Sequence, residues 1–175
     1  MKIPFYLLGL LIRYGPQHGY KLKQIIEERI SDFAKIKLPT IYYHLDKLKD
    51  KGFISETQDK DGNRPEKMVY TITETGIKYF DELYRNQLEA SLNLEFSLDG
   101  ILYFKERIQE ELLRSKLVHK KEEIEKKIEQ LENKKITTLA DIHPLGKKSS
   151  ELIFDHHLIH LRAELEWLKN AIKGL

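Results

Sequence analysis

The sequence predicts a mainly α-helical protein with one small β-hairpin, divided into an N-terminal domain (residues 1–85) and a helical C-terminal domain (residues 86–175). Three observations lead to this prediction. In the first 75 residues, three stretches with the apolar spacing of helices precede two strand-like stretches around an Asp-Gly turn. From about residue 85 onward, charged residues alternate with apolar ones at helical spacing. Near the C-terminus, apolar residues repeat in steps of three and four, as in packed helices.

The composition excludes several classes of protein. The 175 residues are 41% hydrophobic and 33% charged, which favours long helices with solvated faces around a buried core. The absence of cysteine excludes disulfides, thiolate metal sites and cysteine nucleophiles. The apolar run at residues 3–12 lacks the features of a signal peptide, and no run reaches the ~18–20 apolar residues that cross a bilayer. We therefore expect a cytoplasmic protein without a membrane partner.

Three helices are expected in the N-terminal domain. The first covers residues 3–14 and the second about residues 19–29. The third covers about residues 39–51. Pro39 suits its first helical position, because an N–H is not needed there, and Gly52 suits the position after the last turn.

A β-hairpin is expected to follow these helices. Residues 53–57 and 68–72 are the two strands, and residues 60–63 supply the turn through their Asp-Gly pair. Thr73 is a suitable N-cap for a further helix over about residues 74–84.

Three helices followed by a hairpin is the order of a winged helix-turn-helix, in which the third helix enters the major groove of DNA. Polar side chains that can contact phosphates or base edges gather on the outward face of this helix: Thr40, Tyr43, His44 and Lys47. Lys37, just before the helix, can also neutralise phosphate charge. The hairpin tip adds Asn63, Arg64 and Lys67. Residues 1–80 hold 14 Lys and Arg against 10 Asp and Glu, a small basic excess. We therefore expect double-stranded DNA as a partner.

Simpler interpretations exist for each of these features. A polar helix face is commonly only solvated, and a charged hairpin tip is commonly only a turn. A winged helix could also serve as a protein-interaction module without DNA. An enzyme is disfavoured, because the sequence contains no Gly-rich phosphate loop, nucleophile elbow or paired-carboxylate pattern. It is the ordered combination of elements that favours DNA binding.

Short motifs spread over residues 7–80 also carry a family resemblance. They are Leu8-Gly9-Leu10-Leu11, His18-Gly19-Tyr20, Thr40-Ile41-Tyr42, Gly52-Phe53-Ile54, Gly62-Asn63-Arg64-Pro65 and Tyr70-Thr71-Ile72-Thr73. At these spacings they resemble the DNA-binding domain of the PadR family of transcriptional regulators. The resemblance implies a homodimeric regulator, usually a repressor, that leaves its operator when a small-molecule effector or stress signal arrives. An activator of the same family is the alternative. The resemblance also implies that Tyr42 lies on the DNA-facing recognition helix.

The sequence departs from the family pattern at the start of this helix. Lys37-Leu38-Pro39-Thr40 stands where the family usually has Ser-x-Gly-Thr, and Tyr43 stands where Pro is common. These changes preserve the scaffold but alter the helix N-terminus, which bears on the operator sequence.

In the C-terminal domain we expect a break at Asp99-Gly100, one helix over residues 101–133, a connection over residues 137–148, and a last helix starting at Ser149 or Ser150. The last helix carries a heptad seam, which we interpret as the dimerisation surface: Phe154, Leu158, Leu161, Leu165, Leu168 and Ile172. An apolar seam needs a partner, either the preceding helix of the same chain or a second chain, and we expect both. A dimer would place two recognition helices roughly 34 Å apart, which predicts an inverted-repeat operator.

Other chemistry-bearing residues are expected to play minor roles. His156 and His160 have metal-capable i, i+4 spacing beside His157, but packing or hydrogen bonding next to the seam is the favoured interpretation. Protonation of these histidines could alternatively make the interface sensitive to pH. Trp167 could line an effector pocket, although core or interface packing is favoured. No catalytic residue, metal or cofactor is expected.

Overall fold

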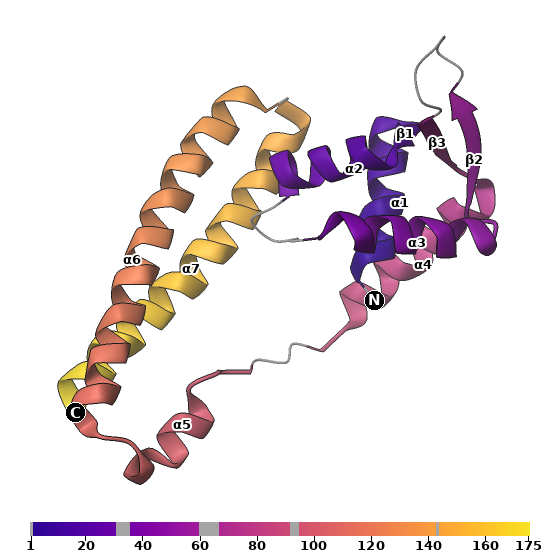
Figure 1. Cartoon of the computed structure of the whole chain (residues 1–175). Coiled ribbons are helices and arrows are strands. Elements are labelled where there is room, and N and C mark those ends of the chain that lie inside the picture. Colours follow the sequence, from indigo (N-terminus) through magenta and orange to yellow (C-terminus); the bar gives the residue numbers. More distant parts are fainter. Residues whose placement is uncertain (1, 31–35, 60–66, 92–94, 143) are drawn as a thin grey trace. The chain divides into compact units, whose positions relative to one another are not determined.

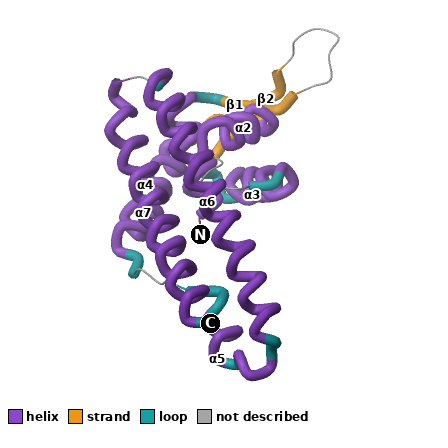
Figure 2. Tube along the Cα trace, turned by 90° about the vertical axis from the view of Figure 1, so that its left-hand side faces the viewer, coloured by secondary structure: helices purple, strands orange, loops and turns teal. Residues whose placement is uncertain are grey.

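The computed structural model describes residues 2–30, 36–59, 67–91, 95–142 and 144–175. The chain divides into two compact units, residues 1–93 and 94–175 (Figure 1). The division falls later than the domain boundary expected at residue 85, because the helix that contains residue 85 continues to Glu89. Both units are dominated by helices, and among the described residues the strands lie in the first unit (Figure 2).

The first unit contains the expected succession of helices and hairpin strands. Its elements are α1 (Lys2–Tyr14), β1 (Gln17–His18), α2 (Gly19–Ile25), the π-helical turn η1 (Ile26–Ile30), α3 (Leu38–Asp50), β2 (Ile54–Asp59), β3 (Lys67–Ile72) and α4 (Glu74–Glu89). The predicted second helix therefore becomes two segments, α2 and η1. The predicted turn at residues 60–63 lies outside the described residues. The mainly helical fold with a small β wing is confirmed.

A third strand, which the sequence did not predict, widens the hairpin into a small sheet. The strand order is β1-β3-β2, with both pairs antiparallel. Gln17 pairs with Tyr70, and Ile54 pairs with Ile72 at the other side of β3. Because β1 lies directly before α2, this pairing ties the start of α2 to the hairpin.

The core of the first unit is formed by apolar side chains of the helices. The side chains with less than 2% exposure are Leu7, Leu8, Leu11, Leu22, Ile26, Ile41 and Leu45. Burial of one such side chain contributes about 1.5–3 kcal/mol. Phe5 and Phe80 add a stacked pair, 5.0 Å between ring centroids, that joins α1 to α4.

The junction between hairpin and α4 depends on Gly76 and Thr73. The Thr73 side chain accepts a hydrogen bond from the Gly76 N–H at 3.1 Å, as the predicted cap requires. A Cβ at Gly76 would lie only 2.0 Å from the carbonyl oxygen of Phe53. Glycine is therefore the residue that lets α4 approach the backbone just before β2 this closely. Gly52, with φ of 71°, ends α3 as predicted.

The second unit differs from the prediction in where its helices begin and end. It contains α5 (Asp99–Tyr103), the 3₁₀ turn η2 (Lys105–Arg107), α6 (Glu110–Asp141) and α7 (Pro144–Gly174). The break predicted at Asp99-Gly100 is wrong, because α5 begins there. The predicted single helix over residues 101–133 is also wrong, since α6 starts only at Glu110. The predicted connection over residues 137–148 is helical up to Asp141 and again from Pro144. Pro144, which can occupy a first helical position, starts α7 in place of Ser149 or Ser150.

The helices α6 and α7 lie side by side along most of their lengths (Figures 1 and 2). The heptad seam of α7 faces this contact: Phe154 (7%), Leu158 (3%) and Leu168 (1%) are the least exposed of its residues. Leu168 packs with Leu113 and Leu117 of α6. Arg162 also forms an ion pair with Glu132 at 2.6 Å. The same-chain helix is therefore one partner of the seam. Among the described helices, none is long and apolar enough to cross a membrane.

Candidate nucleic-acid interface

Helix α3 presents a polar face on a fixed apolar base. Ile41, Leu45 and Leu48 are buried in the core of the first unit, as predicted. Lys37 is the N-cap, and its carbonyl oxygen accepts from the N–H of Thr40 at 3.0 Å, so the helix starts at Leu38, just before the predicted Pro39. The first-turn N–H groups of a helix attract anions such as phosphate. The N-terminal end of α3 is therefore chemically suited to a phosphate backbone.

The exposed face of α3 carries most of the predicted helix contacts. Tyr43 is 59% exposed, Lys47 is exposed, and Thr40 and His44 are half-buried beside them. The Lys47 ammonium lies 5.9 Å from the centroid of the Tyr43 ring, and the Tyr43 and His44 rings meet edge to face at 5.2 Å. These groups combine one cation, one phenol and one imidazole on a single face. That set can both neutralise phosphates and form hydrogen bonds with base edges.

Tyr42 brings together two of the sequence motifs. A Cβ on Gly19 would lie 2.6 Å from Cε1 of Tyr42, so the tyrosine ring rests against the first residue of α2. The ring is still 40% exposed. The glycine of His18-Gly19-Tyr20 therefore provides the space that the tyrosine of Thr40-Ile41-Tyr42 occupies. His18 itself is held to the hairpin, because its Nδ1 lies 3.1 Å from the carbonyl oxygen of Met68.

A polar network that the sequence analysis missed fixes α3 on the sheet. Lys49 donates to Glu56 of β2 at 2.8 Å and lies 3.8 Å from Asp46. Tyr70 of β3 is buried, and burial together with the neighbouring Glu56 carboxylate raises the pKa of its phenol well above the usual value. The hydrogen bond to Glu56 likewise raises the pKa of the Lys49 ammonium. The ion pair between Lys49 and Glu56 ties α3 to β2, and Tyr70 of β3 lies close to the same carboxylate.

The three predicted contacts from the wing are described incompletely. Asn63 and Arg64 lie outside the described residues. Lys67 is the first residue of β3, and its backbone pairs with Asp59. Their part in an interface stays a prediction.

Three packed helices, a paired wing and an exposed third helix define the winged helix-turn-helix class of DNA-binding folds. Residues 7–82 match the family described as transcriptional regulator PadR-like. This domain is therefore similar to the PadR-like transcriptional regulators, and the match confirms the resemblance that the motifs predicted. The matched family and the curated relative are both described as transcriptional regulators, which agrees with the expectation that the chain is not an enzyme.

Relatives extend the similarity to the whole chain. The negative transcriptional regulator PadR of Bacillus subtilis (strain 168) is 29% identical over 175 residues, covering 99% of this chain and 93% of that protein. A crystal structure of Bacillus subtilis PadR in complex with operator DNA has a TM-score of 0.81 at 21% identity, covering 99% of both chains. The Vibrio cholerae virulence activator AphA has a TM-score of 0.80 at 18% identity, covering 98% of this chain and 96% of that one. At these identities the two structures establish the shared fold.

Proposed function

We propose that this chain is a homodimeric transcriptional repressor that reads an inverted-repeat operator through α3. The observation that carries the proposal is the exposed face of Thr40, Tyr43 and Lys47 on a helix anchored by the core and by the Lys49–Glu56 ion pair. A recognition helix has to combine exposure with a fixed orientation, because base edges are read by hydrogen bonds of narrow geometry.

Within this proposal the side chains divide into two roles. Lys37 and Lys47 neutralise phosphates, which supplies affinity without sequence preference. Thr40, Tyr43 and His44 contact base edges, and Tyr42, held at Gly19, borders the same surface. The wing residues Asn63, Arg64 and Lys67 contact the flanking backbone or the minor groove.

Dimerisation is proposed to use the α6–α7 pair. Phe154, Leu158 and Leu168 are buried within the chain, whereas Leu161, Leu165 and Ile172 of the same seam keep part of their surface exposed. More exposed apolar side chains flank them on α7, including Leu152 at 58% and Ile159 at 64%. Apolar surface of this extent favours a second protein chain as its cover.

Repression is favoured over activation by the relative that covers the whole chain, which is described as a negative regulator. The activator AphA shares the fold, so activation is the second candidate. Bacillus subtilis PadR has also been solved in complex with p-coumaric acid. On this basis we propose that a small molecule releases the present chain from its operator.

Selection of bound duplexes from a random pool, followed by mobility shift, tests the proposal. An inverted repeat is the expected product. Lys47→Ala should weaken binding to all duplexes and lower the salt slope by about 1, whereas Tyr43→Ala should also change sequence preference. Lys173→Ala removes the same charge from the exposed end of α7 and serves as the matched control. If Lys47→Ala and Tyr43→Ala bind DNA no differently from Lys173→Ala, α3 is not the reading element.

A further inference from the structure

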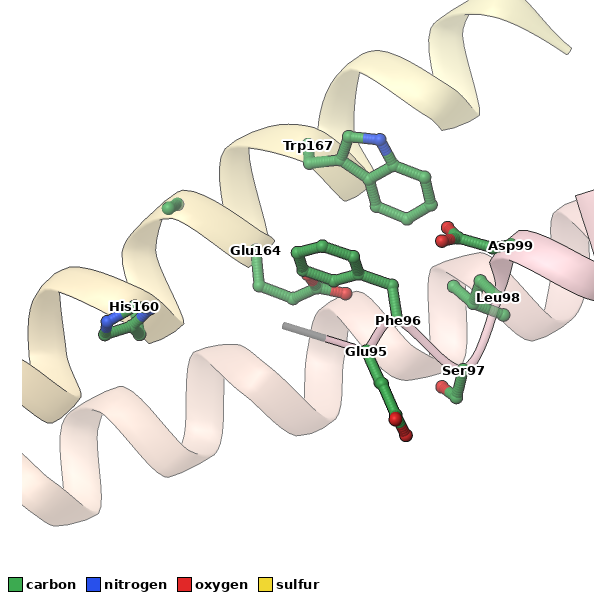
Figure 3. A pocket seen from close by; sticks show the side chains of 9 residues that line it. Glu95, Phe96, Ser97, Leu98, Asp99, His160, Glu164 and Trp167 are labelled. Carbon is green, nitrogen blue, oxygen red and sulfur yellow. The ribbon is translucent and has the colours of Figure 1, made fainter. Parts of the chain in front are cut away.

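The second unit contains a cavity of about 580 Å³ that the proposed DNA-binding role does not use. Its walls come from the segment before α5 and from one side of α7 (Figure 3). The lining residues are Glu95, Phe96, Ser97, Leu98, Asp99, His160, Ala163, Glu164 and Trp167. This volume lies within the range of about 300–1,000 Å³ that is typical of small-molecule sites.

The two walls are held together by packing below the cavity. Leu98 is 7% exposed and packs in one cluster with Leu168, the residue next to Trp167. The Asp99 N–H donates to the carbonyl oxygen of Phe96 at 3.2 Å, which closes a turn that carries both side chains. The positions of Phe96 and Asp99 opposite α7 are therefore fixed by the core of the same unit.

Two aromatic rings supply the apolar part of the cavity. Phe96 is 54% exposed and Trp167 is 40% exposed, although both are large apolar side chains. Figure 3 shows the indole of Trp167 and the ring of Phe96 turned toward the same space. Exposed ring faces bind flat apolar groups, and the face of an indole attracts cations more strongly than that of any other side chain.

Carboxylates supply the polar part of the cavity lining. In Figure 3 the Asp99 carboxylate points toward Trp167 and the Glu164 side chain lies beside Phe96, whereas Glu95 extends away from the rings. Within the part of the chain that the structure describes, neither Asp99 nor Glu164 has an ion-pair partner, and the lining contains no Lys or Arg. A negative cavity with two exposed aromatic rings is complementary to a positively charged ligand.

We propose that this cavity binds an organic cation with a flat aromatic body, such as a quaternary aromatic amine. The rings of Phe96 and Trp167 contact the aromatic body, and the carboxylates of Asp99 and Glu164 lie close to the positive charge. The same carboxylates disfavour aromatic anions, because a carboxylate ligand would meet like charges at the wall. A ligand of the p-coumaric acid type therefore does not fit this cavity.

The regulatory meaning of the site rests on the proposed function, since a cation bound between α5 and α7 becomes an effector only if the chain binds an operator. The binding itself is independent of DNA. It can therefore be measured on the full-length protein alone.

The experiment uses three bicyclic aromatic probes of similar size: the cation 1-ethylquinolinium, the neutral 2-naphthol and the anion 2-naphthoate. Binding is measured by calorimetry and by quenching of Trp167 fluorescence, which reports on the cavity directly because the chain contains a single tryptophan. We expect the cation to bind about 10-fold more tightly than either other probe, which corresponds to one favourable charge interaction. Equal affinity for the three probes, preference for the anion, or no quenching by the cation would overturn the proposal.

Variants that each remove one carboxylate charge identify which wall of the cavity binds the cation. Glu164→Gln and Asp99→Asn should each weaken binding of 1-ethylquinolinium by about 3- to 10-fold and leave 2-naphthol unchanged. Glu166→Gln, two residues along α7 and outside the lining, is the matched control and should change neither affinity. If Glu166→Gln weakens cation binding as much as the other two variants, the cation is held by the general charge of α7 and the site is refuted.

Mobility shift with and without the cation separates the two proposals. Cation binding by a protein that binds no duplex would refute the proposed function and leave the site intact. Duplex binding by a protein that fails to distinguish the three probes would refute the site and leave the proposed function intact.

Discussion

Replacement of Gly19 by alanine tests the contact on which the orientation of Tyr42 depends. The added Cβ would lie 2.6 Å from Cε1, 3.0 Å from Cζ and 3.2 Å from the hydroxyl oxygen of Tyr42. Carbon atoms pack at about 3.5 Å or more, so the ring has to move by roughly 1 Å. Because Tyr42 is 40% exposed, its ring can swing outward without disrupting the core. The variant should therefore fold with the Tyr42 side chain of α3 displaced.

Two opposing effects bound the expected change in the free energy of unfolding of the Gly19→Ala variant. Displacement of a packed ring costs about 1–3 kcal/mol, whereas replacement of glycine in the first turn of α2 gains up to about 1 kcal/mol. We expect a net loss of about 1–2 kcal/mol in urea unfolding, and operator binding weakened by about 5- to 10-fold. In a Tyr42→Ala background the obstructing ring is absent, so Gly19→Ala should be neutral or stabilising.

A double-mutant cycle measures this difference directly. The coupling between the two positions should be at least about 1 kcal/mol, in the range found for residues in contact. If Gly19→Ala lowers stability by the same amount in the presence of Tyr42 and in the Tyr42→Ala background, the two residues do not share the space that the structure gives them, and Gly19 does not set the position of the Tyr42 ring.

Three further predictions concern the scaffold. Gly76→Ala should lower the free energy of unfolding by about 3 kcal/mol or more, because the added Cβ would lie 2.0 Å from the carbonyl oxygen of Phe53. The urea midpoint should fall accordingly, and unchanged stability would contradict this close approach. Glu56→Gln should lower the free energy of unfolding by only about 1 kcal/mol. It should nevertheless weaken operator binding in mobility shift, because Lys49 of α3 loses its ion-pair partner on β2. A loss of stability without any change in DNA affinity would refute a positioning role for Glu56. Leu117→Ala, at a fully buried position of α6, should cost about 2–5 kcal/mol in thermal unfolding, and a change below about 0.5 kcal/mol would contradict its burial.

Much of the candidate site was predictable from local sequence. The stripe of Ile41, Leu45 and Leu48 identifies the buried side of α3, and this leaves Thr40, Tyr43 and Lys47 outside. The cap at Thr73 and the turn at Gly52 follow from residue type, since few other residues satisfy those backbone positions.

The network of Lys49, Glu56 and Tyr70 could not have been found in this way. Its members lie on three different elements, and each is an ordinary polar residue within its own local pattern. Strand β1 was missed for a related reason: two residues are too short to show an alternating pattern, and only pairing with β3 makes them a strand. The cavity beside Trp167 likewise depends on two segments that lie far apart in the sequence.

The helix boundaries of the second unit also depend on tertiary contacts as well as on local sequence. The apolar spacing of a helix continues through residues 101–109, but the backbone does not form one helix there. Leu98 and Ile108 both pack with Leu113, Leu117 and Leu168 of α6 and α7, and the chain has to turn for both to reach this cluster. Conversely, Pro144 and Gly146 suggest a loop, but a proline is compatible with the first turn of α7.

The sequence by itself determined the class of fold, the order of helices and hairpin in the first unit, the resemblance of residues 7–80 to a known family and the polar face of α3, because periodicity, caps and motif spacing are properties of neighbouring residues. The tertiary structure decided that the ion pair of Lys49 with Glu56 fixes this face and that the heptad seam of α7 packs against α6 of the same chain. It also decided that Phe96 and Trp167 line one cavity. These features arise from contacts between residues far apart in the chain. Their physical basis is shared burial and matched charge, which become defined only when the elements pack.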